Sequence, residues 1–152
     1  MAVHKIGLVG AGRMGSLHAG NAAANPRFAL DWVADQDSDA AARLAIETGA
    51  EATDYKTILA DPEVKGVIVA SSTSSHLENV LAAVRAGKAV FCEKPLSLDA
   101  DTLAEALPEI EAAGSPVFIA FNRRFDPHLA ALKRKLAAGE VGRAETVHIV
   151  NH

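Results

Sequence analysis

The stretch Lys5-Ile6-Gly7-Leu8-Val9-Gly10-Ala11-Gly12-Arg13-Met14-Gly15 decides the fold of this chain. Its first five residues are typical of a buried strand, and the pattern G-x-G-x-x-G follows them directly. The residues from Arg13 to about Ala24 are typical of a helix. In this order the three glycines permit a tight turn, close approach of a pyrophosphate group, and helix–strand packing. The pyrophosphate would lie at the positive end of that helix.

Short β-branched segments alternate with longer Ala-rich amphipathic segments along the rest of the chain, and this alternation predicts βαβ units. Such units build an α/β fold with a Rossmann-type, doubly wound parallel sheet and right-handed crossovers. Further strands are expected over 28–34, 50–53, 66–70, 89–92 and 117–121, and further helices over 38–48, 55–59, 75–86, 97–113 and 127–138.

Composition narrows the class of protein. The chain has 152 residues, of which 49% are hydrophobic and 22% charged, as expected for one globular domain of ordinary size. A net charge of −4 offers no field that would gather nucleic acid or an anionic membrane. Without a long apolar run or a leader-like N-terminus, the expected location is the cytoplasm. The single cysteine, Cys92, excludes an internal disulfide and is expected to be buried. No histidine spacing predicts a metal site.

Asp35 lies 20 residues beyond Gly15, directly after the second expected strand. A carboxylate at this place accepts hydrogen bonds from the ribose hydroxyls of adenosine. It would repel a 2′-phosphate, and Gln36-Asp37 supplies no compensating cation, so NAD is favoured over NADP. In the alternative interpretation, Asp35 only begins the Asp35–Asp39 turn and caps the next helix. An S-adenosylmethionine enzyme would also show glycines and an acidic residue, but the later motifs argue against one.

Polar residues follow two further strands. Ser71-Ser72-Thr73-Ser74-Ser75-His76 comes after the fourth expected strand, and Glu93-Lys94-Pro95 comes after the fifth. Because ligands of open α/β sheets bind at the carboxyl ends of the strands, both segments are expected to line one polar rim. A Glu-Lys pair taken alone is more typical of a solvated ion pair.

Three more segments add to these motifs: Val33-Ala34-Asp35, Gly87–Pro95 and Phe121-Asn122-Arg123-Arg124-Phe125-Asp126. Taken together, the whole chain resembles the Gfo/Idh/MocA family (glucose–fructose oxidoreductase/inositol dehydrogenase). It looks especially like the myo-inositol 2-dehydrogenase members. The resemblance implies NAD-dependent oxidation of a secondary alcohol on a cyclic polyol or sugar. It also implies a cis peptide bond between Lys94 and Pro95.

The resemblance assigns roles to particular residues. It implies that Lys94 lies between the nicotinamide and the substrate, and that Arg123 contacts the cofactor or the polyol, so these two form the expected catalytic set. Members often have a proline within the segment that corresponds to Ser71–Ser75, and its absence here predicts a looser loop. The residues expected to bind NAD are Gly10, Ala11, Gly12, Arg13, Met14, Gly15, Asp35, Ser71, Ser72, Thr73, His76, Glu93 and Lys94.

Members of that family are more than twice as long, and an Asp and a His in their second, α+β domain complete the catalytic site. We therefore expect an NAD-binding Rossmann domain over 1–121. Residues 122–152 are expected to form a linker helix and, at Ala144–Val150, the first strand of an otherwise missing substrate domain. Such a truncated chain would be inactive alone. One alternative is a free-standing NAD(H)-binding module without catalysis, and another is a structural piece that dimerises edge to edge through its last strand. The residues leave open whether the chain forms a homo-oligomer.

Overall fold

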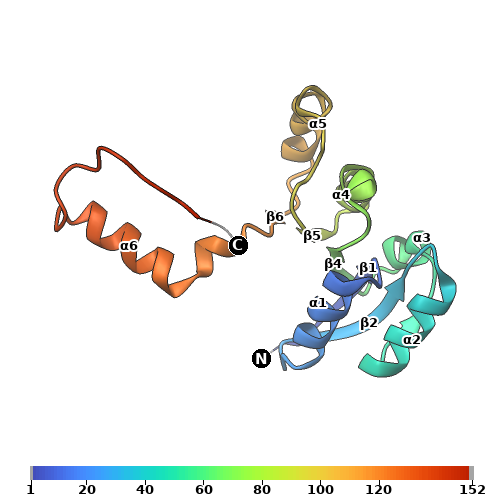
Figure 1. Cartoon of the computed structure of the whole chain (residues 1–152). Helices are drawn as coiled ribbons and strands as arrows, with labels where there is room; N and C mark the ends of the chain where they lie inside the picture. The colour runs from blue at the N-terminus through green and yellow to red at the C-terminus, as the bar shows by residue number, and fades with distance from the viewer. Residues whose placement is uncertain (1, 151–152) are drawn as a thin grey trace. The chain divides into compact units, whose positions relative to one another are not determined.

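The structure, a computed structural model of the chain, describes residues 2–150 (Figure 1). The contacts within the chain divide it into two units, Met1–Ala120 and Phe121–His152. The last two residues of the expected second segment, Asn151 and His152, lie outside the described residues.

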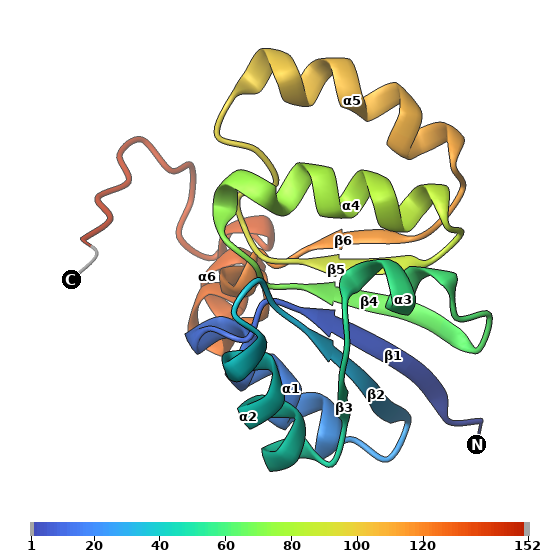
Figure 2. The same ribbon diagram turned by 90° about the vertical axis from the view of Figure 1, so that its right-hand side faces the viewer.

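The first unit is built on a six-stranded sheet of order β3-β2-β1-β4-β5-β6, in which all the paired strands are parallel (Figure 2). This confirms the predicted doubly wound sheet. The strand order reverses beside β1, which pairs with β2 on one side and β4 on the other, so this point is the topological switch point of the sheet. The strands are β1 (His4–Val9), β2 (Phe28–Ala34), β3 (Glu51–Ala52), β4 (Val64–Val69), β5 (Ala89–Cys92) and β6 (Val117–Ile119).

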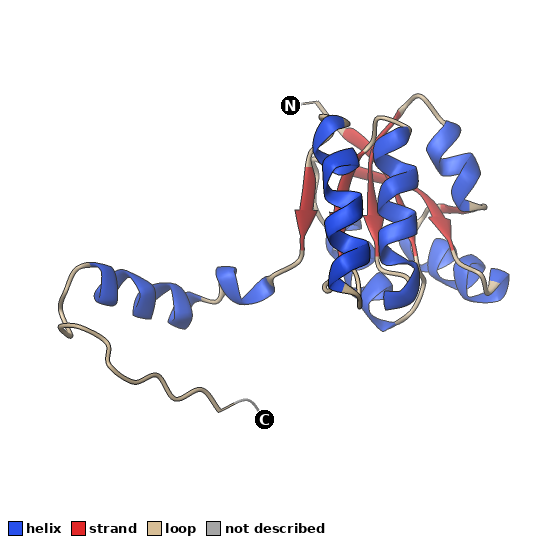
Figure 3. Cartoon of the chain, turned by 90° about the horizontal axis from the view of Figure 1, so that it is seen from above, coloured by secondary structure: helices blue, strands red, loops and turns tan. Residues whose placement is uncertain are grey.

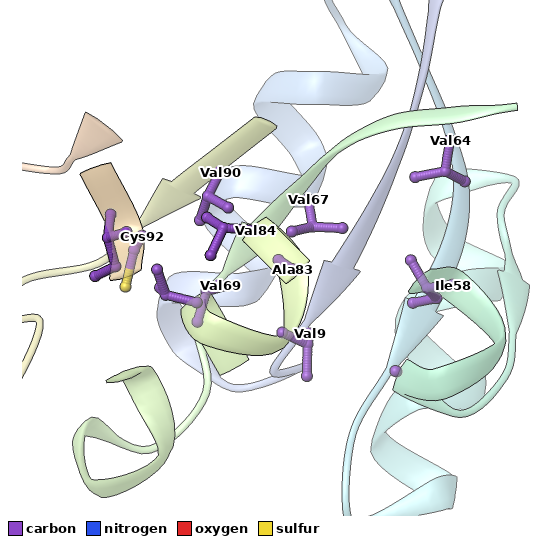
Figure 4. Close-up of a cluster of buried hydrophobic side chains, with 12 residues drawn as sticks. Val9, Ile58, Val64, Val67, Val69, Ala83, Val84, Val90 and Cys92 are labelled. Atoms are coloured by element: carbon purple, nitrogen blue, oxygen red, sulfur yellow. The ribbon is translucent and has the colours of Figure 1, made fainter. Parts of the chain in front are cut away.

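Helices pack on both faces of this sheet (Figure 3). On one face, Leu8 and Val33 are completely buried beneath the alanine-rich sides of α1 and α2. On the other face, side chains of α3, α4 and α5 pack over Val67, Val69 and their neighbours (Figure 4). The helices of this unit are α1 (Arg13–Ala23), α2 (Ser38–Thr48), α3 (Tyr55–Ala60), α4 (His76–Arg85) and α5 (Ala100–Ala112).

Local capping chemistry decides where these helices begin and end. The carboxylate of Asp37 accepts hydrogen bonds at the start of α2, and Gly49 ends α2 in a left-handed conformation, with φ of 75°. The helix expected from Ser97 begins only at Ala100. The physical reason is that Asp99 is the capping residue and accepts a hydrogen bond from Thr102 N, whereas the Ser97 hydroxyl is bonded within the preceding turn.

The second unit contains a short 3-10 helix, η2 (Asn122–Phe125), followed by α6 (Pro127–Ala137). The Asp126 carboxylate caps α6, and Pro127 occupies its first helical position, where a missing N–H costs nothing. Residues 142–150 form no regular secondary structure, so the strand expected over Ala144–Val150 is absent. Backbone groups form a strand only against a hydrogen-bonded neighbour, and no strand of the described chain pairs there. Whether this segment pairs with a second domain or with a second chain, as either expectation requires, stays a prediction.

Three further features of the described residues bear on the class of protein. None of their helices is long and apolar enough to cross a membrane. Within residues 2–150, no group of three or more His, Cys, Asp or Glu residues is placed to hold a metal ion. Cys92 is completely buried at the end of β5, as expected. Burial, together with the negative charge of Glu93, raises the pKa of this thiol to about 12, so it stays neutral.

Candidate functional site

The motifs of the first unit lie at one edge of the sheet, because each follows the carboxyl end of a strand. Gly10 continues β1, Asp35 follows β2, Ser71 follows β4 by one residue, and Glu93 continues β5. Backbone hydrogen bonds extend the strand pairing into these segments: Gly10 N donates to the carbonyl of Ala34 at 2.8 Å. This edge, at the switch point beside β1, is where open α/β sheets bind ligands.

The glycine turn leaves the first helix open to a ligand. Gly10 has φ of +103°, which disfavours any other residue, and a Cβ on Gly15 would overlap the carbonyl oxygen of Gly10. A Cβ on Gly12, by contrast, would meet nothing within 4 Å. Gly12 is also the N-cap of α1, where no side chain caps the helix and the first turn holds no acidic residue. The turn therefore leaves space and amide donors for a phosphate group, which fits a dinucleotide.

Asp35 ties this turn to the end of β2. One of its carboxylate oxygens accepts a hydrogen bond from Ala11 N at 2.6 Å, and the other accepts one from Asp37 N at 2.8 Å. The cap of α2 is Asp37, so the interpretation of Asp35 as the capping residue is wrong, although Asp35 does begin the turn. A carboxylate has acceptor capacity beyond two bonds, and this one is only partly buried. It can therefore still accept a hydrogen bond from a ribose hydroxyl.

A cavity of about 380 Å³ lies beside Asp35, between the glycine turn, the start of α3 and the serine-rich segment that precedes α4. Three carboxylates line it, those of Asp35, Asp54 and Glu78, and no Lys, Arg or His is among the described residues that line it. Hydrogen bonds from Thr57 lower the pKa of the Asp54 carboxyl, which keeps that group ionised at neutral pH. The cavity is therefore negatively charged.

The serine-rich segment is ordered by its own hydroxyl groups. Residues Thr73–Ser75 form a 3-10 helix, η1. Ser75 Oγ donates to Ser71 Oγ at 3.1 Å, and the side-chain amide of Asn79 donates to the same oxygen at 3.0 Å. These bonds hold the loop that was expected to be looser without a proline. Asn79 is a residue of this site that no sequence motif indicated, and its only sequence signal is its position one helical turn after Ser75.

The Glu93-Lys94-Pro95 segment carries the expected cis peptide bond between Lys94 and Pro95, and the Lys94 side chain is exposed. His76 differs from the expectation of a residue that lines the cofactor pocket. It is 2% exposed, its Nδ1 lies 2.7 Å from the carbonyl oxygen of Pro95, and its Nε2 lies 3.1 Å from that of Ser71. Both ring nitrogens are thus engaged inside the protein.

The other residue of the expected catalytic set, Arg123, belongs to the second unit. It is an exposed residue of η2. The neighbouring Arg124 guanidinium lies 5.9 Å from the ring centre of Phe121, a cation–π contact within the same motif. The Phe-Asn-Arg-Arg-Phe-Asp motif thus has a structural part, the 3-10 helix and the cap of α6, besides any role of Arg123.

A parallel sheet with this strand order, an uncapped helix after a glycine turn and an acidic residue at the end of β2 define a dinucleotide-binding Rossmann domain. The chain belongs to the Gfo/Idh/MocA family, described as "Oxidoreductase family, NAD-binding Rossmann fold", whose family model matches residues 4–121. NAD is thus the cofactor for which this domain is built.

Known proteins similar to this chain include several inositol dehydrogenases. An inositol 2-dehydrogenase of Rhizobium meliloti is 35% identical over 97% of this chain and 44% of its own length. The crystal structure of a myo-inositol dehydrogenase from Corynebacterium glutamicum is 39% identical, has a TM-score of 0.85, and is matched over 93% of this chain and 43% of that one.

A scyllo-inositol dehydrogenase from Lactobacillus casei, crystallised with NAD(H) and scyllo-inositol, is 28% identical with a TM-score of 0.86. It is matched over 92% of this chain and 42% of its own. The chain therefore spans less than half the length of the relatives that it matches.

Proposed function

We propose that this chain supplies the NAD-binding part of a dehydrogenase that oxidises a secondary alcohol of a cyclic polyol, with inositols as the first substrates to test. The observation that carries the proposal is the juxtaposition, at one sheet edge, of the open N-terminus of α1, the Asp35 carboxylate and the exposed Lys94. The inositol dehydrogenases among its relatives support the substrate class. The division of labour proposed is cofactor binding by 1–121, with 122–152 linking to a substrate-binding part.

The charge of the site supports NAD rather than NADP. In the proposed complex the ribose hydroxyls of adenosine face Asp35, and the 2′ position lies toward the cavity that also holds Asp54 and Glu78. A 2′-phosphate there would meet negative charges with no cation from the residues that line the cavity. Electrostatic repulsion would therefore exclude NADP.

The proposed chemistry divides between the cofactor and the chain. NAD, when bound, accepts the hydride that leaves the substrate carbon. Lys94 would hydrogen-bond the reacting oxygen and polarise it, and the hydroxyl proton would pass to a base of the substrate-binding part, which is not among these 152 residues. Arg123 cannot act as a base, because a guanidinium stays protonated, so its proposed role is to orient the polyol or the cofactor through its fork of donors.

A cofactor titration tests the binding half of the proposal. NAD at about 100 times its Kd is expected to stabilise the folded chain by about 2.7 kcal/mol, which raises the melting temperature by several degrees. NADP at the same concentration is expected to cause a much smaller rise. The measurement is thermal unfolding of the 152-residue chain followed by circular dichroism. An unchanged melting temperature at millimolar NAD would remove the nucleotide-binding function altogether.

An activity assay tests the catalytic half. These 152 residues are expected to oxidise myo-inositol with NAD at a negligible rate, because the Asp and His that the family resemblance implies for catalysis are not among them. The readout is NADH absorbance with myo-inositol and scyllo-inositol. A relative that contains its whole substrate domain serves as the positive control. Rapid NADH production by the 152-residue chain would contradict the division of labour proposed above.

A further inference from the structure

The Lys94–Pro95 dipeptide is held from two sides, by a side chain of α4 and by the side chain of the preceding residue, Glu93. On one side, the carbonyl oxygen of Pro95 lies 2.7 Å from Nδ1 of His76, at the start of α4. On the other side, the backbone N–H of Lys94 donates to Oε2 of Glu93 at 3.2 Å. The backbone of this dipeptide is thus held at the N–H of Lys94 and at the carbonyl of Pro95.

Glu93 is in turn held by α1. His18 Nε2 donates to Oε1 of Glu93 at 2.8 Å, and the two side chains are only 16% and 12% exposed. The His18 ring meets the ring of Phe91 edge to face, with the ring centres 5.0 Å apart. Packing on Phe91 sets the orientation of the imidazole, and the imidazole sets that of the carboxylate. Because the pair is mostly shielded from water, its hydrogen bond is stronger than that of a surface pair.

This arrangement connects the cofactor-binding helix to the residue expected to act on the substrate. His18 lies one turn of α1 beyond Gly15, and its partner is 75 residues away in sequence. One carboxylate oxygen of Glu93 faces His18, and the other faces the backbone N–H of Lys94. The carboxylate therefore links the Lys94 backbone to α1. A shift of the Glu93 side chain would release both bonds together.

We propose that His18 is a positioning residue for Lys94, acting through the Glu93 carboxylate, with His76 holding the opposite side of the same dipeptide. The inference rests on the proposed function, since it takes the Glu93–Pro95 segment to form the nicotinamide half of the cofactor cleft. Neither histidine touches the reacting atoms in this account. Their effect is to keep the segment in one geometry, so that the cofactor meets a preformed surface.

The test compares two ligands that share the adenosine end. NADH carries the nicotinamide, whereas ADP-ribose lacks it, and both are titrated calorimetrically into the 152-residue chain. His18→Leu keeps bulk against Phe91 and removes the hydrogen bond to Glu93. It is expected to weaken NADH about tenfold, the loss typical of a hydrogen bond to a charged group, and to leave ADP-ribose within about twofold. Amide hydrogen exchange at Lys94 is expected to accelerate in the same variant.

A rescue variant and a control complete the design. His18→Gln retains a donor near the place of Nε2 and is expected to restore NADH affinity to within about threefold of the wild type. His4→Ala removes an exposed histidine at the start of β1, the opposite edge of the sheet, and is expected to change neither ligand. If His18→Leu does not fold, Glu93→Gln takes its place and is expected to show the same selective loss of NADH affinity.

The outcomes separate this inference from the function on which it rests. Equal weakening of NADH and ADP-ribose would overturn it, because a purely structural role of His18 affects both ligands. Unchanged NADH affinity, or unchanged exchange at Lys94, would overturn it as well. A wild-type chain that binds neither ligand would instead overturn the proposed function, and this inference with it.

Discussion

Gly12→Val is expected to weaken NAD binding by about 100-fold or more, because the valine side chain would occupy the space in which the pyrophosphate is proposed to lie, and several hydrogen bonds to a charged group would be lost. The fold should tolerate the change. The backbone of Gly12 has φ of −75° and ψ of −169°, which any residue adopts, and a Cβ there meets nothing within 4 Å. Only the N-cap position suffers, at a cost of about 1 kcal/mol.

The matched control for this prediction is Gly20→Val. Gly20 lies in the same helix, is exposed, and also has no atom within 4 Å of an added Cβ, but it lies more than one helical turn beyond Gly15, the last glycine of the motif. NAD affinity should stay close to that of the wild type in this variant. The measurement is calorimetric titration, with a melting curve for each variant. Wild-type affinity in Gly12→Val would show that the phosphates do not bind at this turn.

Asp35→Ser is expected to weaken NAD by about tenfold and to bring NADP affinity near that of NAD, since the substitution removes both the ribose acceptor and the charge that repels a 2′-phosphate. The variant should also lose stability, by about 1–2 kcal/mol. The reason is that Asp35 accepts hydrogen bonds from the Ala11 and Asp37 backbones, which join the glycine turn to β2. Calorimetric titration with both cofactors measures the first effect, and urea unfolding measures the second.

Asp37→Ser is the control that isolates the position of the charge. It removes a carboxylate two residues further on, and serine is itself a good N-cap for α2. Its preference for NAD over NADP should stay as in the wild type. If Asp37→Ser relaxed the preference as much as Asp35→Ser, a diffuse electrostatic effect would account for the result. An unchanged NAD affinity in Asp35→Ser would discard the ribose contact.

Patterns of short range account for what was predicted correctly. The glycine turn and the capping Asp37 are signals read within four to six residues, and the alternation of strands and helices needs only periodicity. Once β1 and the G-x-G-x-x-G turn are recognised, the rules of βαβ connection place Asp35, Ser71 and Glu93 at one sheet edge without further information. The observed strand order, β3-β2-β1-β4-β5-β6, agrees with the same rules.

Errors arose where two local signals competed, or where a partner was assumed. Ser97 and Asp99 both favour a helix start, and only the hydrogen bond from Thr102 N to Asp99 selects between them. The alternation over Ala144–Val150 fits a strand, but a strand exists only when another segment pairs with it. Periodicity describes one segment at a time and gives no information about the segment that pairs with it.

By itself, then, the sequence determined the Rossmann architecture, the open helix terminus and the acidic residue beside it, because each depends on neighbours along the chain. Only the tertiary structure decided what surrounds Lys94. The pairing of His18 with Glu93 joins residues 75 positions apart. His76, which was expected to contact the cofactor, is buried and lies against the carbonyl oxygen of Pro95. Such contacts depend on how α1 and α4 pack against the sheet, and packing geometry has no period that a linear pattern could reveal.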